Sequence, residues 1–175
     1  MPNIDIEKCQ LTHYPAGVLA EPAKPIEKID DNNRRLVEKM TEIILKNKGI
    51  GLAGPQAGVN LRIFIISLKG TKEGLRVYIN PTVAPKTDQL EAMEEGCLSV
   101  PGVYTKIRRY NKCTVTATDL KGNEFTEEAQ GLYARALQHE YDHIEGVTIA
   151  ERMSITAKIA HRKKLKDLQK KHNNR

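Results

Sequence analysis

The sequence of 175 residues has few cysteines and no long apolar run, and each absence removes a class of protein. Cys9, Cys97 and Cys113 are too few and too widely spaced to predict a disulfide-stabilised secreted fold. The longest purely aliphatic or aromatic run, residues 63–66, is far shorter than the ~20 residues that a membrane helix requires. No basic start followed by an apolar block opens the chain, so no secretory signal is expected. We therefore expect a reducing, cytoplasmic setting and no membrane partner.

Internal repeats and low-complexity linkers are also missing, which predicts a single catalytic domain spanning residues 1–175. The net charge of +6 lies almost entirely in residues 154–175, where eight Lys or Arg accompany one acid, Asp167. The body of the chain is close to neutral, so no specific nucleic-acid partner is predicted. The basic segment fits either a solvated helix face or a surface that docks onto RNA-rich material, such as a ribosome.

Periodicity and turn residues predict an α+β fold, with short antiparallel strands around a central helix and with helices near both ends. Helices are expected at about 30–47, at about 132–144 and from the N-cap Ser154 into the basic segment. Strands are expected at about 62–67, 75–79, 104–110, 113–118 and 124–128. Ile155 with Ile159, and Leu165 with Leu168, are expected to pack one side of the last helix on the body.

The strongest local motif is H-E-x-x-H, formed by His139, Glu140 and His143. Histidines four residues apart lie on one helix face, so both imidazoles can bind one metal ion. Glu140 lies beside the first histidine and can accept a proton from the attacking water. A chance pattern on an amphipathic helix is the alternative. The neighbouring Asp142 is either an acceptor that orients a ring or a solvated acid.

Cys97 is the natural third ligand, because a catalytic site needs three protein ligands and one open position. It lies between glycine and proline in residues 94–102, where a turn can aim the side chain. A small buried hydrophobe is the alternative for any lone cysteine, and it is the interpretation preferred for Cys9 and Cys113. The glycine-rich segment 49–58 lacks the Gly-Lys-Ser/Thr ending of a phosphate loop. There the amide of Gln56 can stabilise an oxyanion.

Three segments together resemble the three signature motifs of the peptide deformylases, in the same order and spacing. They are Gly49-Ile-Gly-Leu-Ala-Gly-Pro-Gln56, Glu95-Gly-Cys-Leu-Ser99 and Gln138-His-Glu-Tyr-Asp-His143. Gly54 departs from the usual alanine. Tyr104 stands where many bacterial members carry arginine. Together with Ala134-Arg135 and the third motif, this makes the chain look closer to the chloroplast-type branch.

The resemblance implies a hydrolase that removes the N-terminal formyl group from formylmethionine of newly synthesised polypeptides. It implies one divalent metal on Cys97, His139 and His143, with Fe²⁺ as the working ion and Zn²⁺, Ni²⁺ or Co²⁺ as substitutes in purified protein. Glu140 transfers protons, while the Gln56 side chain and the Leu98 backbone N–H bind the oxyanion.

The resemblance also assigns residues to the substrate. Ile50 and Gly51 correspond to residues that pair with the peptide backbone, and Tyr104 stands at a substrate-contacting position. Four residues of the central helix correspond to the wall of the methionine pocket, with Arg135 at its mouth; they are Leu132, Arg135, Ala136 and His139. Glu95 and Arg109 correspond to an ion pair that supports the cysteine loop, and two surface charges are the alternative.

Two other functions are weighed against this one. A zincin-like metallopeptidase would take its third ligand downstream, where Glu145 and Glu151 are available, but it leaves the Cys97 motif unexplained. A catalytically silent metal- or ribosome-binding relative is disfavoured, because Glu140, Gln56 and all three ligands are present.

Overall fold

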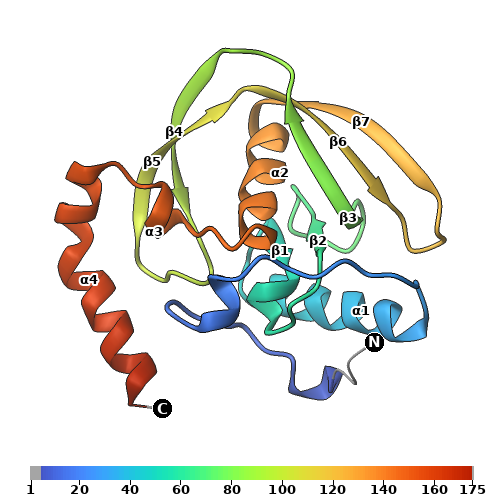
Figure 1. The fold of residues 1–175 in the computed structure, drawn as a ribbon, viewed down its shortest axis with the longest axis horizontal. Coiled ribbons are helices and arrows are strands. Elements are labelled where there is room, and N and C mark those ends of the chain that lie inside the picture. The colour runs from blue at the N-terminus through green and yellow to red at the C-terminus, as the bar shows by residue number, and fades with distance from the viewer. Residues whose placement is uncertain (1–4, 175) are drawn as a thin grey trace.

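The central element of the fold is the helix α2 (Gly131–Ile144), which is enclosed by two antiparallel sheets (Figure 1). The computed structural model describes residues 5–174. The mixed helix and antiparallel sheet agree with the predicted α+β class, and helices lie near both ends of the chain. Across residues 5–174, every helix is too short or too polar to cross a bilayer.

The larger sheet has five strands in the order β1-β2-β3-β6-β7, and all neighbouring strands are antiparallel. The strands are β1 (Gly51–Ala53), β2 (Ile63–Ile66), β3 (Arg76–Pro85), β6 (Lys112–Thr118) and β7 (Glu124–Gln130). Strand β2 reads as a continuous apolar run because both of its faces are buried. Ile63 and Ile65 pack towards α1 (Asp31–Lys46), whereas Phe64 and Ile66 pack in the cluster that contains α2.

The second sheet pairs β4 (Leu90–Gly96) with β5 (Tyr104–Tyr110), in a register that joins Gly96 to Tyr104. Strand β5 was predicted with these bounds, but β4 was not predicted. Its sequence, LEAMEEG, contains no β-branched residue, and six of its seven residues are exposed. Pairing with β5 therefore specifies β4, whereas local propensity does not.

Helix α1 begins where capping chemistry predicts. The Asp30 side chain accepts hydrogen bonds from the backbone N–H groups of Asn32 and Asn33, which would otherwise lack partners. Met40 and Ile44 of α1 are fully buried against the sheet. The remaining helical elements are α3 (Ile149–Arg152), α4 (Ile155–Asn173) and the 3₁₀ turns η1 (Ile6–Lys8), η2 (Gly17–Leu19) and η3 (Gly54–Ala57).

Helix α4 begins after Ser154, whose hydroxyl accepts from the Ala157 N–H, as predicted. The predicted packing of its apolar residues is only half right. Leu168 is buried in a cluster with Val100, but Ile155 and Ile159 are 79% and 68% exposed. Ile159 and Leu168 are nine residues apart, about two and a half turns, so they lie on opposite sides of the helix.

Leu168→Ala should lower the free energy of unfolding by about 2 kcal/mol, because it opens a cavity against Val100 and Met153. Ile159→Ala is the matched control and should change it by less than about 0.5 kcal/mol, since this side chain is exposed. Urea unfolding of both variants measures the difference. Equal losses would contradict the observed orientation of α4.

Candidate metal centre and active site

Three possible metal ligands, carried by two different parts of the fold, lie close together. Cys97 follows the end of β4, and His139 and His143 lie one turn apart on α2. Their ligand atoms all lie within 4.8 Å of one another, and the Cys97 Sγ is 3.2 Å from the His143 Nε2. This is the donor set that sequence reasoning predicted, and thiolate and imidazole are ligands suited to a divalent transition metal.

The turn that carries Cys97 is held from both sides. The Val100 N–H donates to the Cys97 carbonyl over 3.0 Å, and the Tyr14 N–H donates to the Ser99 carbonyl over 2.8 Å. Val100 and Val103 are fully buried beneath the turn. The sulfur therefore sits on a packed support rather than on a free loop.

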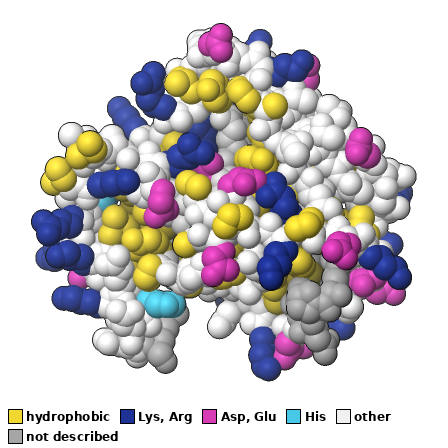
Figure 2. Space-filling view, viewed as in Figure 1, with side chains coloured by type: hydrophobic (Ala, Val, Ile, Leu, Met, Phe, Trp, Pro, Cys, Tyr) yellow, Lys and Arg dark blue, Asp and Glu magenta, His cyan; other side chains and the backbone are white. Residues whose placement is uncertain are grey.

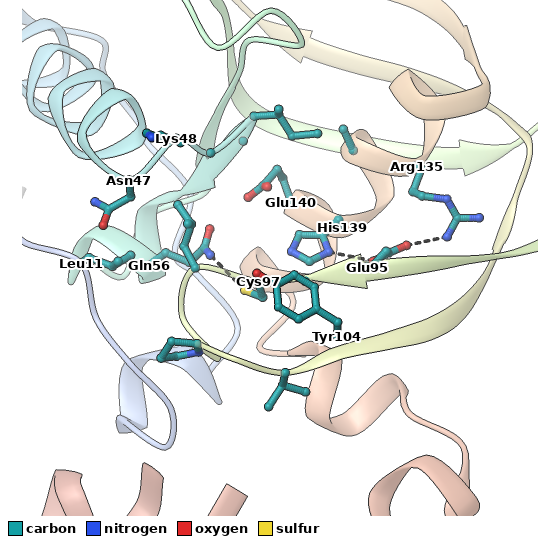
Figure 3. Close-up of a pocket in the computed structure, with 18 of the residues that line it drawn as sticks. Leu11, Asn47, Lys48, Gln56, Glu95, Cys97, Tyr104, Arg135, His139 and Glu140 are labelled. Atoms are coloured by element: carbon teal, nitrogen blue, oxygen red, sulfur yellow. Dashed lines mark hydrogen bonds and ion pairs between the residues drawn. The ribbon is translucent and has the colours of Figure 1, made fainter. Parts of the chain in front are cut away.

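Glu95 orients the first histidine. The His139 Nδ1 is 2.9 Å from the Glu95 Oε2, so it donates to this carboxylate and leaves Nε2 facing the other ligands (Figure 3). Arg109 binds both oxygens of Glu95, over 2.7 and 3.0 Å. Glu95 and Arg109 are both buried, so they form an ion pair and are not two surface charges.

Asp142 has neither of the two roles that the sequence suggested. It is buried and accepts from Arg109 NH1 over 2.8 Å and from Arg152 Nε over 2.9 Å. It neither orients a ligand ring nor lies in solvent. Successive helix residues point about 100° apart, so Asp142 faces Arg109 and α3 while His143 faces the ligands.

The electrostatic surroundings of Cys97 favour its thiolate form. Burial opposes ionisation of Cys97, but His143 and His139 outweigh it and hold the pKa of the thiol well below its usual 9.0. Burial likewise disfavours a charged His139, yet Cys97 and Glu95 raise its pKa to about 10. A thiolate is the form of cysteine that binds metal, and His139 would release its proton on becoming a ligand, so the donor set fits a divalent ion.

Glu140 and Gln56 lie beside this cluster. Glu140 is buried, and its Oε2 has no hydrogen-bond partner among the described residues. Burial raises the pKa of Glu140 to about 7. The Gln56 Oε1 accepts from the Ala53 N–H over 2.8 Å, which directs its Nε2 to within 3.4 Å of the Cys97 Sγ.

A cavity of about 640 Å³ opens over the cluster. Its lining includes Glu140 and Gln56, and it also includes every residue that the resemblance assigned to substrate or oxyanion, namely Ile50, Gly51, Leu98, Tyr104, Leu132, Arg135 and Ala136. Tyr104 and Leu132 are exposed at the rim, and Ala136 is buried. Arg135 is also buried and does not lie at the mouth, because its guanidinium binds Glu95 over 2.6 Å.

The two acids that could supply the third ligand of a zincin-like site form other interactions. Glu145 forms an ion pair with Arg62 over 2.7 Å, and Glu151 caps the start of α3 by accepting from the Thr148 N–H over 2.8 Å. Neither belongs to the group of metal-ligand atoms found among the described residues.

Comparisons with known proteins agree with this geometry. A sequence model of the polypeptide deformylase family matches residues 8–158. The chain is similar to a peptide deformylase of Chromohalobacter salexigens, with 38% identity over 94% of this chain and 95% of the relative. It is 38% identical to the chloroplastic peptide deformylase 1B of Oryza sativa subsp. japonica, over 93% of this chain and 61% of the relative. The crystal structure of a Plasmodium falciparum peptide deformylase superposes with a TM-score of 0.91 and 30% identity, covering 94% of this chain and 98% of that one.

Glu95→Gln should destabilise the metal-free protein at neutral pH by about 3 kcal/mol, because Arg109 and Arg135 lose their buried counter-charge. Burial raises the pKa of Glu95, but His139 and Arg109 outweigh it and lower it from 4.5 to about 2. The ionised carboxylate therefore contributes its full stability above pH 4.5 and loses it as the pH falls towards 2.

Urea unfolding at pH 7, 4 and 3 measures this dependence. The wild-type and variant free energies should converge as the pH falls. The control is Glu91→Gln, whose exposed side chain lies on the same strand, and it should follow the wild type. A constant gap between wild type and Glu95→Gln would contradict the ionised role of Glu95.

Proposed function

The chain belongs to the polypeptide deformylase family, and on that premise we propose that it hydrolyses the N-terminal formyl amide of formylmethionine on newly made polypeptides. One observation carries the residue assignment. Cys97, His139 and His143 bring their ligand atoms within 4.8 Å of one another, and Glu140 lines the same cavity.

We assign Cys97, His139 and His143 as ligands of one divalent ion, with Fe²⁺ as the working metal. The soft thiolate with two imidazoles supports a first-row transition metal rather than Mg²⁺ or Ca²⁺. When bound, such an ion supplies Lewis-acid chemistry that polarises a carbonyl and makes water more acidic. Zn²⁺, Ni²⁺ and Co²⁺ suit the same donors.

Glu140 is the proton-transfer residue in this proposal. Glu140 lines the cavity, and its buried Oε2 has no hydrogen-bond partner among the described residues, so the carboxylate can accept the proton of the attacking water. It then donates that proton to the nitrogen that leaves when the C–N bond of the formyl amide breaks. A pKa raised by burial to about 7 suits both steps at neutral pH.

Gln56 and Leu98 are proposed to bind the oxygen that becomes negative as water attacks the formyl carbon. The Ala53 N–H donates to the Gln56 Oε1, which turns the Nε2 towards Cys97, and one of the two Nε2 hydrogens can donate to the oxyanion. The Leu98 N–H follows Cys97 directly and supplies the second donor. Fixed donors of this kind are worth ~10²–10³ in turnover.

Strand β1 is proposed to bind the peptide backbone along its free edge. It stands at the end of the five-stranded sheet, and within residues 5–174 it pairs with β2 alone. The Ile50 carbonyl accepts from the Ser67 N–H, so by antiparallel alternation the N–H and carbonyl of Gly51 point outward. A Cβ at Gly51 would lie 2.3 Å from the Glu140 Oε1, which explains why the strand carries glycine beside the carboxylate.

The side chains around this edge complete the substrate site. Tyr104, Leu132 and Ala136 are proposed to contact the substrate, with Ala136 in the wall of the methionine pocket. The exposed Ile50 side chain adds an apolar contact.

The cytoplasm is the proposed compartment, and one catalytic domain over residues 1–175 is the proposed organisation. The three free cysteines support a reducing setting, because a thiolate ligand is readily oxidised.

Transient contact with the ribosome through α4 is a further part of the proposal. A shallow hollow on this helix is lined by Ile159 together with a group of basic residues, namely Arg162, Lys163, Lys166 and Lys170. This face lies opposite the side that packs on the body, so it is free to meet a polyanion. Phosphate contacts would make such binding depend strongly on salt.

Glu140→Gln should retain the metal while kcat for a formyl-Met tripeptide falls by ~10²–10⁴ or more. Anaerobic purification, metal quantification and the deformylation assay on one sample test this. Glu124→Gln, an exposed change on β7, is the control. Loss of metal with Glu140→Gln would make Glu140 a ligand, and normal turnover would remove it from the reaction.

Charge reversal at Lys163, Lys166 and Lys170 should lower co-sedimentation with ribosomes at low salt and leave tripeptide hydrolysis within about twofold. Reversal is preferable to truncation, because truncation would remove the buried Leu168. Sedimentation at two salt concentrations is the measurement, with a wild-type sample in parallel. If co-sedimentation with ribosomes is unchanged, the basic side of α4 is a solvated helix face and not a docking surface.

A further inference from the structure

Arg135 has surroundings that do not suit a residue of a methionine pocket. It is a charged side chain that is only 5% exposed, although it lines the same cavity as Ala136. In Figure 3 the Glu95 carboxylate lies between the Arg135 guanidinium and the His139 ring. Arg135 and His139 are four residues apart, so they share one face of α2.

The guanidinium makes three contacts, and each reaches the two-stranded sheet. Arg135 NH1 donates to the Glu95 Oε1 over 2.6 Å and to the Ile107 carbonyl over 3.0 Å. Arg135 NH2 donates to the Glu91 carbonyl over 2.8 Å. One side chain of α2 therefore holds both β4 and β5, in a planar fork that lysine cannot reproduce.

Arg109 does not make these contacts redundant. It divides its donors between Glu95 and Asp142, with NH1 on Asp142 over 2.8 Å. The Glu95 Oε1 accepts from both arginines, and its Oε2 accepts from Arg109 and His139. Without Arg135, the Glu95 Oε1 and the carbonyls of Glu91 and Ile107 would each lose one donor.

We propose that Arg135 is a positioning residue of the metal centre, which clamps Glu95 and β4 onto α2 and so sets the ring of His139 relative to Cys97. Cys97 follows Glu95 by two residues, and His139 binds Glu95 directly, so both ligands depend on where this carboxylate lies. The inference uses the proposed function only in assuming that Cys97, His139 and His143 hold a divalent ion.

The test compares Arg135→Met and Arg135→Lys with Arg108→Met, an exposed change on β5 that serves as the control. The first measurements are the Co²⁺ affinity of the metal-free protein, by chelator competition, and the visible absorption of the Co²⁺-loaded protein. The next are kcat and KM for formyl-Met and formyl-Leu peptides. Circular dichroism checks that each variant is folded.

Arg135→Met should weaken Co²⁺ binding by ~10–100-fold, the usual effect of losing a group that supports a ligand. Its visible bands should shift, and kcat should fall for both peptides while the ratio of their kcat/KM values is unchanged. Arg135→Lys should fall between this variant and the wild type, and Arg108→Met should match the wild type.

Unchanged Co²⁺ affinity and absorption in Arg135→Met, with an altered preference between the two peptides, would overturn the proposal and make Arg135 a pocket wall. If Arg135→Met does not fold, Arg135→Lys decides, and wild-type Co²⁺ affinity and bands there would likewise overturn it. A wild-type protein that binds Co²⁺ but hydrolyses neither peptide would refute the proposed function, while the affinities would still test Arg135.

Discussion

The buried carboxylate of Glu95 is the group on which the site depends. A charge removed from water is tolerated only when cations and hydrogen bonds replace the lost hydration, and here Arg109, Arg135 and His139 do so. Arg109 extends the same cluster to Asp142, on the face of α2 that meets α3. The ion cluster therefore joins the strand that leads to Cys97 to the helix that carries both histidines.

This connection explains how so small a sheet can carry a metal ligand. A two-stranded ribbon is marginally stable by itself, and most of β4 is exposed. The contacts of Arg135 with Glu91, Glu95 and Ile107 hold the ribbon on α2. On its other side α2 packs against the apolar face of the larger sheet, through Phe64, Tyr78 and Leu137. The helix is thus fixed by apolar packing on one side and by ion pairs on the other.

The last helix shows how one element can serve two surfaces. Leu168 packs under the cysteine turn, whereas the opposite side of α4 presents Ile155, Ile159 and basic side chains to solvent. Figure 2 shows Lys and Arg side chains gathered along this edge of the molecule. Opposite sides of a helix can change independently, so the exposed side is open to a separate role while the buried side supports the Cys97 turn.

Sequence alone determined the features that depend on local spacing. The four-residue interval of His139 and His143, the caps at Asp30 and Ser154, and the alternation in β5 are set by backbone geometry within a few residues. The family followed from three such short motifs in order.

Only the tertiary structure decided what depends on distant residues. Strand β4 exists because β5 pairs with it. Arg135 serves Glu95, which is 40 residues away in sequence, and Asp142 is buried by Arg109 and Arg152 rather than exposed. Sequence patterns also predicted that Ile155 and Leu168 lie on one side of α4, whereas in the structure Ile155 is exposed and Leu168 is buried. Neither an ion pair nor a strand pairing leaves a periodic pattern in the two segments that form it. The interaction stabilises the protein only after folding has brought these distant segments together.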